Sequence, residues 1–342
     1  MQILVTGASG FIGSFIVEKA MELGHDVWAG IRPTSSRRYL QDKRIHFIEL
    51  NLEDMAVLQQ QLSSFKTQSP YGWDIVIHAA GATKGKDRDD FFKTNYKGTQ
   101  HLVESLRLCH MLPKRMIYLS SLSVLGGIRQ QPVSDEKGHV YAPILDDDKA
   151  EPNTAYGESK LAAEEYLRKQ TDLDFVILRP TGVYGPREKD YFLMAKSIKQ
   201  HIDFSVGFKP QEITFVYVKD LVDAVFLVSE KGERSHSYFV SDGNTYSSKD
   251  FSVLLQKEMG ITGVLHIKAP LWLLRLICNA NTLLSKVTGK LTALNNDKYH
   301  ILKQRNWRCD ISPITALGYE PHYNLEKGVR ETIAWYKKEK WI

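Results

Sequence analysis

Tyr156 and Lys160 are predicted to lie on one face of a helix. They begin and end the segment Tyr-Gly-Glu-Ser-Lys, and residues four positions apart are neighbours on adjacent helical turns. A free phenol has a pKa of about 10, whereas a nearby ammonium favours the phenolate and lowers that pKa. We therefore expect Tyr156 to exchange a proton with a substrate hydroxyl or carbonyl. An exposed tyrosine and lysine with no chemical role would show the same spacing.

Serine hydroxyls stand at the end of a predicted strand, Arg115–Ser120. Ser120, Ser121 and Ser123 all lie there, and the ligand crevice of open α/β sheets is found at the carboxyl ends of the strands. Such a hydroxyl could hydrogen-bond the reacting oxygen and orient it toward Tyr156. Capping of the strand end is the structural alternative for each serine.

A glycine-rich turn opens the chain. Gly7, Gly10 and Gly13 follow the predicted strand Ile3–Thr6 and lead into an amphipathic helix. Glycines permit a tight turn and a close approach to a pyrophosphate, whose charge is stabilised by N–H groups at a helix N-terminus. We therefore predict a dinucleotide site here that also includes Ser9, Phe11 and Ile12.

The end of the second predicted strand, Asp26–Gly30, bears on the choice of nicotinamide cofactor. An acidic residue at this place would bind the ribose diol of NAD, but the chain has Arg32, followed closely by Ser35 and Arg37. A guanidinium can bind a 2′-phosphate. We therefore expect NADP to be preferred, with NAD as the alternative cofactor. The structural alternative is that these arginines are solvated cations of a loop.

Short apolar runs alternate with amphipathic stretches through the first 180 residues. Repeated βα units predict a doubly wound parallel sheet of the Rossmann type, with helices on both faces. After Pro180 the regular alternation of strand and helix patterns ends, which indicates a smaller mixed α/β domain that binds the substrate. We expect a cofactor domain over 1–180, with parts of 213–245 returning to it, and a substrate domain over 181–342.

The composition is that of an ordinary globular protein. Lys and Arg number 45 against 40 Asp and Glu, for a net charge of +5, and the short basic clusters do not indicate nucleic-acid binding. Cys109, Cys278 and Cys309 lack the spacing of a disulfide framework or a zinc site. We expect no metal, no targeting peptide and a cytoplasmic location.

The stretch over 269–284 is the most apolar of the chain. It is shorter than the ~20 apolar residues of a spanning helix, and Arg275, Asn279 and Asn281 interrupt it. Leu271, Leu274, Ile277 and Leu284 fit one helical face. We expect a core or substrate-lid helix, with a membrane-surface helix as the less favoured alternative.

Together these motifs resemble the extended, epimerase/dehydratase-like branch of the short-chain dehydrogenase/reductase family. The TGxxGxxG turn, the serine-ended strand and YxxxK occur in the family's order across nearly the whole chain. The resemblance implies that Ser121, Tyr156 and Lys160 are catalytic and that Lys160 also holds the nicotinamide ribose. Leu125 stands where the family usually has a tyrosine.

The resemblance also assigns residues that the spacing does not. Further cofactor contacts are implied for Asn51, Leu52, Ala79, Ala80, Gly81, Asn95, Pro180 and Val183. Arg187 would lie near the substrate, and Asp220 would be structural, capping the helix that follows it. A homodimer built on the helices of Asn95 and Tyr156 is likewise implied.

Two substrate classes remain open, with nearly equal support. The family resemblance admits an epimerase of a sugar or sugar nucleotide, but the run over 206–218 lacks the arginine that usually binds a diphosphate. The apolar stretch over 269–284 is similar to hydroxysteroid and dihydroflavonol relatives, which reduce or oxidise apolar ketones and alcohols. Leu122 and Ser123 replace the acidic pair of dehydratases. A catalytically silent NADP-binding sensor is the third possibility.

Overall fold

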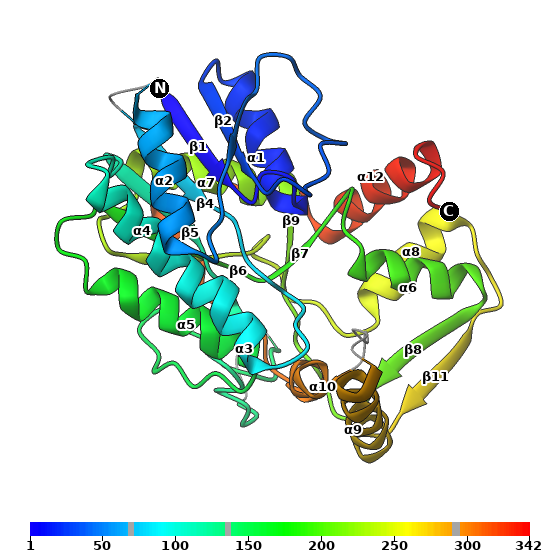
Figure 1. The fold of residues 1–342 in the computed structure, drawn as a ribbon. Coiled ribbons are helices and arrows are strands. Elements are labelled where there is room, and N and C mark those ends of the chain that lie inside the picture. Colours follow the sequence, from blue (N-terminus) through cyan, green and yellow to red (C-terminus); the bar gives the residue numbers. More distant parts are fainter. Residues whose placement is uncertain (68–71, 134–137, 289–294) are drawn as a thin grey trace.

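A seven-stranded parallel sheet forms the centre of the computed structural model, which describes residues 1–67, 72–133, 138–288 and 295–342. Its strands are β1 (Gln2–Thr6), β2 (Asp26–Ile31), β3 (His46–Glu49), β4 (Ile75–His78), β5 (Arg115–Leu119), β6 (Phe175–Pro180) and β10 (Ser237–Val240). They lie in the order β10-β6-β5-β4-β1-β2-β3 (Figure 1). The predicted fold class is confirmed.

Helices cover both faces of this sheet. One face packs against α2 (Met55–Lys66), α4 (Gly98–Leu108) and α5 (Ala155–Arg168), and the other against α1 (Phe11–Glu22) and α7 (Val218–Lys231). The short α3 (Arg88–Phe91) and a π-helical turn (Phe92–Lys97) lead into α4. Because both faces are covered, β4, β6 and β10 are buried along their whole length.

The second half of the chain builds a smaller layer beside the sheet (Figure 1). It contains α6 (Asp190–Lys199), α8 (Asp250–Met259) and α12 (Leu325–Lys338), with the parallel strand pairs β7 (Gly182–Tyr184) with β9 (Phe215–Tyr217) and β8 (Ile202–Val206) with β11 (Leu265–Ala269). Its core is rich in aromatic side chains, among them Tyr184, Phe215 and Phe251. The short α11 (Ser312–Ala316) packs on β10 of the central sheet instead. The domain boundary at residue 180 stays a prediction.

The apolar stretch forms α9 (Leu271–Thr288), which packs against α10 (Asn296–Lys303). Leu274 and Cys278 are buried, but Trp272 is 65% exposed and Leu284 is 54% exposed. Of the two roles expected for this stretch, the core helix is wrong, because only one narrow side of the described part of α9 is covered. The substrate-lid helix stays a prediction. Within the described residues, no helix is long and apolar enough to cross a membrane.

Asp220 is structural, but it does not cap its own helix. Its two carboxylate oxygens accept hydrogen bonds from the backbone N–H groups of His322 and Tyr323, each at 3.0 Å. The N-cap residue of α7 is Tyr217, which makes no side-chain capping bond. Asp220 thus fastens the segment before α12 to α7, across about a hundred residues of sequence.

We expect Asp220→Ala to lower the free energy of unfolding by about 2 kcal/mol, because two backbone donors lose their acceptor. Asp223→Ala, on the same helix, is the matched control: Asp223 forms a half-exposed ion pair with Lys19 and should cost less than about 1 kcal/mol. Urea denaturation of both variants measures the difference. Equal stabilities for the two variants would contradict this role of Asp220.

Candidate active site

The predicted phosphate turn lies between β1 and α1. Gly7 has a φ of +67°, and a Cβ there would lie 2.7 Å from the backbone of Ala80. Gly10 is the N-cap residue of α1 and supplies no side-chain acceptor to the first N–H groups of the helix. Gly13, Ser9, Phe11 and Ile12 belong to this turn and first helical turn. Uncapped N–H groups beside a glycine cradle fit a dinucleotide pyrophosphate.

The other predicted cofactor residues gather at the same edge of the sheet. Ala79–Gly81 follow β4 and Ser121 follows β5, while Pro180 ends β6 and Val183 lies in β7. Strands β5, β4 and β1 are neighbours, and the chain order reverses between β4 and β1. Ligands of open α/β sheets bind at such a switch point. Thr181, which the sequence analysis did not single out, has a buried hydroxyl without a hydrogen-bond partner.

The first turn of α5 brings Tyr156 next to Ser121. A Cβ on Gly157 would lie 2.5 Å from the carbonyl oxygen of Ser123, so only a glycine lets the helix approach this loop so closely. The Ser121 hydroxyl lies near enough to the phenol to lower the pKa of Tyr156. The structure therefore brings these two predicted side chains together.

The three candidate serines have different partners. Ser120 donates to the buried carboxylate of Glu164 at 2.5 Å. Ser121 accepts from the backbone N–H of Ser123 at 3.1 Å and donates to its hydroxyl at 3.2 Å. Ser121 thus does both things considered for it: it caps the short 3-10 turn Leu122–Val124, and it faces Tyr156. Of the three, Ser121 is the one whose hydroxyl acts on the pKa of the Tyr156 phenol.

Lys160 lies beneath this pair and is 5% exposed. Its Nζ donates to the carbonyl oxygen of Leu119 at 2.7 Å and stands 4.8 Å from the ring centre of Tyr118. Burial lowers the pKa of Lys160 to about 8, partly opposed by the carboxylate of Glu164. A Cβ on Gly81 would lie 3.1 Å from Nζ, so Lys160 reaches the segment after β4, where the ribose is expected.

The expected lowering of the phenol pKa by Lys160 is not what the structure shows. Burial raises the pKa of Tyr156 above its ordinary value, and the Ser121 hydroxyl opposes this only in part. The physical reason is that removal from water penalises a phenolate more than one neutral neighbour helps it. The phenol of Tyr156 therefore keeps its proton at neutral pH.

Asn95 has a supporting role in this site. Its side chain accepts from the backbone N–H of Ala82 at 2.7 Å, and donates to the carbonyl of Ala82 and to the hydroxyl of Ser159. Asn95 lies in the π-helical turn before α4 and so ties the segment after β4 to α5. Nearby His78 is fully buried, and burial lowers its pKa to about 3, so its imidazole is neutral.

Sequence reasoning missed Asp297, on α10. Its carboxylate oxygens accept from the backbone N–H groups of Ala155 and Tyr156 at 3.2 and 3.3 Å. These are donors of the first turn of α5, which a negative charge stabilises. No local pattern links positions so far apart in the sequence. The acidic residue two places into α10 was the only signal available.

The residues predicted to bind the adenosine half of the cofactor follow β2 and β3. The N–H of Arg32 donates to the Ser35 hydroxyl at 3.0 Å, and the guanidinium of Arg37 stacks 4.3 Å above the ring of Phe47. Asn51 accepts from the N–H of Glu53, and the carbonyl of Leu52 contacts His101. Arg32 is exposed, whereas the guanidinium of Arg37 is stacked on the ring of Phe47.

Arg187, which the resemblance places near the substrate, contacts α1. Its guanidinium donates to the hydroxyl of Ser14 at 2.8 Å and to the carboxylate of Glu18 at 2.5 Å, both on α1, and it packs over the ring of Tyr39. The side chain is 12% exposed. These contacts hold the loop after β7 against α1, and a substrate role for Arg187 stays a prediction.

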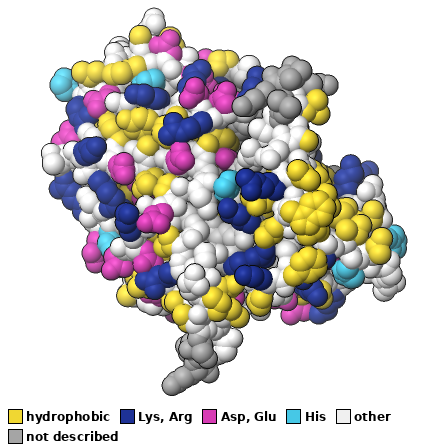
Figure 2. Space-filling view, turned by 90° about the horizontal axis from the view of Figure 1, so that it is seen from below, with side chains coloured by type: hydrophobic (Ala, Val, Ile, Leu, Met, Phe, Trp, Pro, Cys, Tyr) yellow, Lys and Arg dark blue, Asp and Glu magenta, His cyan; other side chains and the backbone are white. Residues whose placement is uncertain are grey.

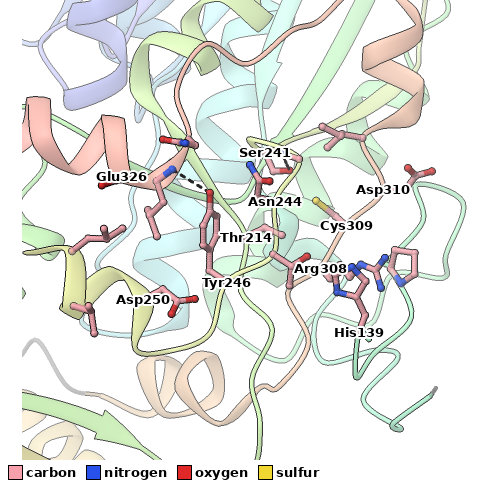
Figure 3. A pocket seen from close by; sticks show the side chains of 18 residues that line it. His139, Thr214, Ser241, Asn244, Tyr246, Asp250, Arg308, Cys309, Asp310 and Glu326 are labelled. Atoms are coloured by element: carbon pink, nitrogen blue, oxygen red, sulfur yellow. Dashed lines mark hydrogen bonds between the residues drawn. The ribbon is translucent and has the colours of Figure 1, made fainter. Parts of the chain in front are cut away.

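A cavity of about 850 Å³ opens elsewhere in the smaller layer (Figure 3). It is lined by Thr214, Ser241, Tyr246 and Cys309, among others, and not by Ser121, Tyr156 or Lys160. The Thr214 hydroxyl donates to the Trp307 carbonyl, and the Tyr246 hydroxyl donates to Asp242. Because these polar groups already have protein partners, the cavity is a weaker site candidate than the sheet edge. Cys109, Cys278 and Cys309 are all buried and free.

Known proteins resemble the chain over nearly its whole length. The chain is 23% identical to the sterol-4-alpha-carboxylate 3-dehydrogenase (decarboxylating) of Saccharomyces cerevisiae, with 97% of each chain covered. It is also 23% identical to a putative UDP-glucose 4-epimerase of Methanocaldococcus jannaschii, with 98% of each covered. Among solved structures, the UDP-glucose 4-epimerase of Thermotoga maritima, determined with UDP-glucose, superposes with a TM-score of 0.76 at 22% identity, covering 99% of this chain and 100% of that one.

Residues 3–241 match the family described as the NAD dependent epimerase/dehydratase family. That range contains the glycine turn, Ser121 and the Tyr156–Lys160 pair. The family match, together with relatives named as dehydrogenases and epimerases, shows that the chain is an NAD-dependent enzyme. This protein belongs to the NAD-dependent epimerase/dehydratase family.

Proposed function

We propose that this enzyme oxidises an alcohol or reduces a ketone, with Tyr156 as the acid and base. The observation that carries the proposal is the contact of the first turn of α5 with the loop after β5, which sets the Tyr156 phenol beside the Ser121 hydroxyl. A bound nicotinamide would supply or accept the hydride. The N-terminus of α1, the Ala79–Gly81 segment and Lys160 would hold it.

In the reducing direction, the substrate carbonyl oxygen accepts hydrogen bonds from Ser121 and Tyr156. As the carbonyl carbon gains a hydride, its oxygen takes the phenol proton, and the product is the alcohol. Lys160 remains fixed by the Leu119 carbonyl, from where its Nζ would hold the nicotinamide ribose. In the oxidising direction the same proton returns to Tyr156.

For the substrate we favour an apolar or amphiphilic ketone or alcohol over a sugar nucleotide. The amphipathic α9 packs on α10, which in turn contacts the N-terminus of α5. The run over 206–218 has no arginine for a diphosphate, and a relative of equal identity acts on a sterol by its name.

Epimerisation of a sugar or sugar nucleotide is the second candidate. The relative named as a putative UDP-glucose 4-epimerase covers the chain equally well. Net cofactor turnover separates the two: a reductase or dehydrogenase consumes cofactor in proportion to substrate, whereas an epimerase returns the hydride. A screen of apolar ketones and nucleotide sugars, followed by cofactor absorbance and product stereochemistry, decides between them.

Tyr156→Phe should lower kcat by about 10²- to 10⁴-fold, because the phenyl ring keeps the packing but has no proton to transfer. Binding of the cofactor, measured by fluorescence titration, should change little. Tyr166→Phe on the same helix is the matched control, since its hydroxyl bonds to Glu104 on α4. Unchanged activity in Tyr156→Phe would favour the silent cofactor-binding sensor instead.

The pH dependence should differ between the two directions. Because burial raises the pKa of Tyr156, the phenol stays protonated at neutral pH, and ketone reduction should hold its rate there. Alcohol oxidation needs the phenolate, so its kcat/KM should rise steadily between roughly pH 6 and 9. Steady-state profiles in both directions test this. An oxidation rate that is flat across that range would contradict it.

Arg32 is proposed to select NADP. Arg32→Ala should lower kcat/KM for NADP by about tenfold or more while leaving NAD nearly unchanged, because a guanidinium–phosphate hydrogen bond is lost. Arg38→Ala is the neighbouring control, since Arg38 is paired with Glu339. A wild-type preference for NAD that persists in Arg32→Ala would overturn the NADP proposal.

A further inference from the structure

One end of the molecule exposes a group of large apolar side chains. They come from three elements and the turn after β8, and we call them the α9 face: Phe204, Phe208, Leu265, Ile267, Trp272, Leu273, Leu276 and Ile277. Phe208 is 68% exposed and Trp272 65%. Figure 2 looks onto this end, and hydrophobic side chains gather there with Lys and Arg beside them. Soluble monomers seldom expose so large a contiguous apolar patch without a binding role.

The arrangement within α9 explains why these side chains face outward. Leu274 and Cys278, four residues apart, form the buried stripe of the helix. Trp272 with Leu276 and Leu273 with Ile277 repeat the same spacing on the exposed side. The helix is therefore apolar on more of its surface than the protein covers. The exposed apolar side of such a helix can be buried in an apolar environment outside the protein itself.

The charges beside the α9 face are cationic. Between Glu258 and Asp297 the sequence has no acidic residue, whereas it contains His266, Lys268 and Arg275. The Nζ of Lys268 lies 5.1 Å from the ring centre of Phe208, within the face. Asp203 on β8 is 6% exposed and pairs with His266 at 2.9 Å. An anionic partner therefore meets no exposed carboxylate on α9 or β11.

We propose that the α9 face docks onto the surface of an anionic lipid bilayer. Helix α9 would lie in the interface, with Trp272 and Leu276 in the acyl boundary and Lys268 and Arg275 at the headgroups. No described helix spans a membrane, so this is surface attachment. A second copy of the chain fits less well, because a two-fold contact would bring the cations of one face toward those of the other. The proposal does not depend on the reaction proposed above.

The test is sedimentation of the full-length protein with vesicles. Vesicles of phosphatidylcholine with phosphatidylglycerol should carry down the wild type, those of phosphatidylcholine alone much less, and added salt should release it. Trp272→Ser/Leu276→Ser and Lys268→Glu/Arg275→Glu should each weaken binding by about tenfold or more. These side chains are exposed, so circular dichroism should show an intact fold.

Matched controls come from the opposite part of the molecule. Leu23→Ser, at the C-cap of α1, removes a side chain that is 49% exposed, and Lys43→Glu reverses an exposed charge. Both should bind vesicles as the wild type does. The proposal is overturned if the wild type ignores anionic vesicles or if the α9-face variants bind equally well. It is also overturned if light scattering shows a self-association that Trp272→Ser/Leu276→Ser abolishes, because the face would then be a contact between copies.

Discussion

The position of α5 on the sheet is the constraint on which the site depends. Gly157 lets its first turn approach the Ser123 carbonyl, and Lys160 bonds to the Leu119 carbonyl at the end of β5. One turn further on, the buried carboxylate of Glu164 receives Arg179 of β6 at 2.6 Å. A buried ion pair that loses one partner leaves an uncompensated charge, at a cost of about 3–5 kcal/mol. These contacts fix the position of α5 on the sheet, and in that position Tyr156 lies next to Ser121.

The same constraint connects distant parts of the chain. Asp297 stabilises the N-terminus of α5 from α10, and α10 packs on α9. Helix α5, helix α10 and the proposed docking face on α9 are thus consecutive neighbours. Structures with this fold include epimerases of nucleotide sugars, and a shared fold does not fix a substrate. The segments around the N-terminus of α5 are therefore the part of the molecule that is most informative about substrate specificity.

The sequence predicted those features that local patterns carry. The buried strands, the turn of Gly7 and the placement of Tyr156 and Lys160 on one helical face all follow from periodicity and spacing. Contacts between distant segments left no such trace. Arg187 binds α1, Asp220 bonds residues 322 and 323, and Asp297 caps α5; each partner lies more than a hundred positions away. The exposure of α9 was likewise missed, because an amphipathic pattern shows which face is apolar but not whether protein covers it.

The central claim is that a bound nicotinamide faces the Ser121–Tyr156 pair. A crystal structure of the protein with its cofactor and a substrate analogue measures this directly. We expect a pyrophosphate at the N-terminus of α1, Lys160 on the nicotinamide ribose, and the reacting oxygen of the analogue within roughly 3 Å of both the Tyr156 and Ser121 hydroxyls. A nicotinamide ring bound away from Tyr156, or a dinucleotide bound elsewhere than above Gly7–Gly13, would contradict it.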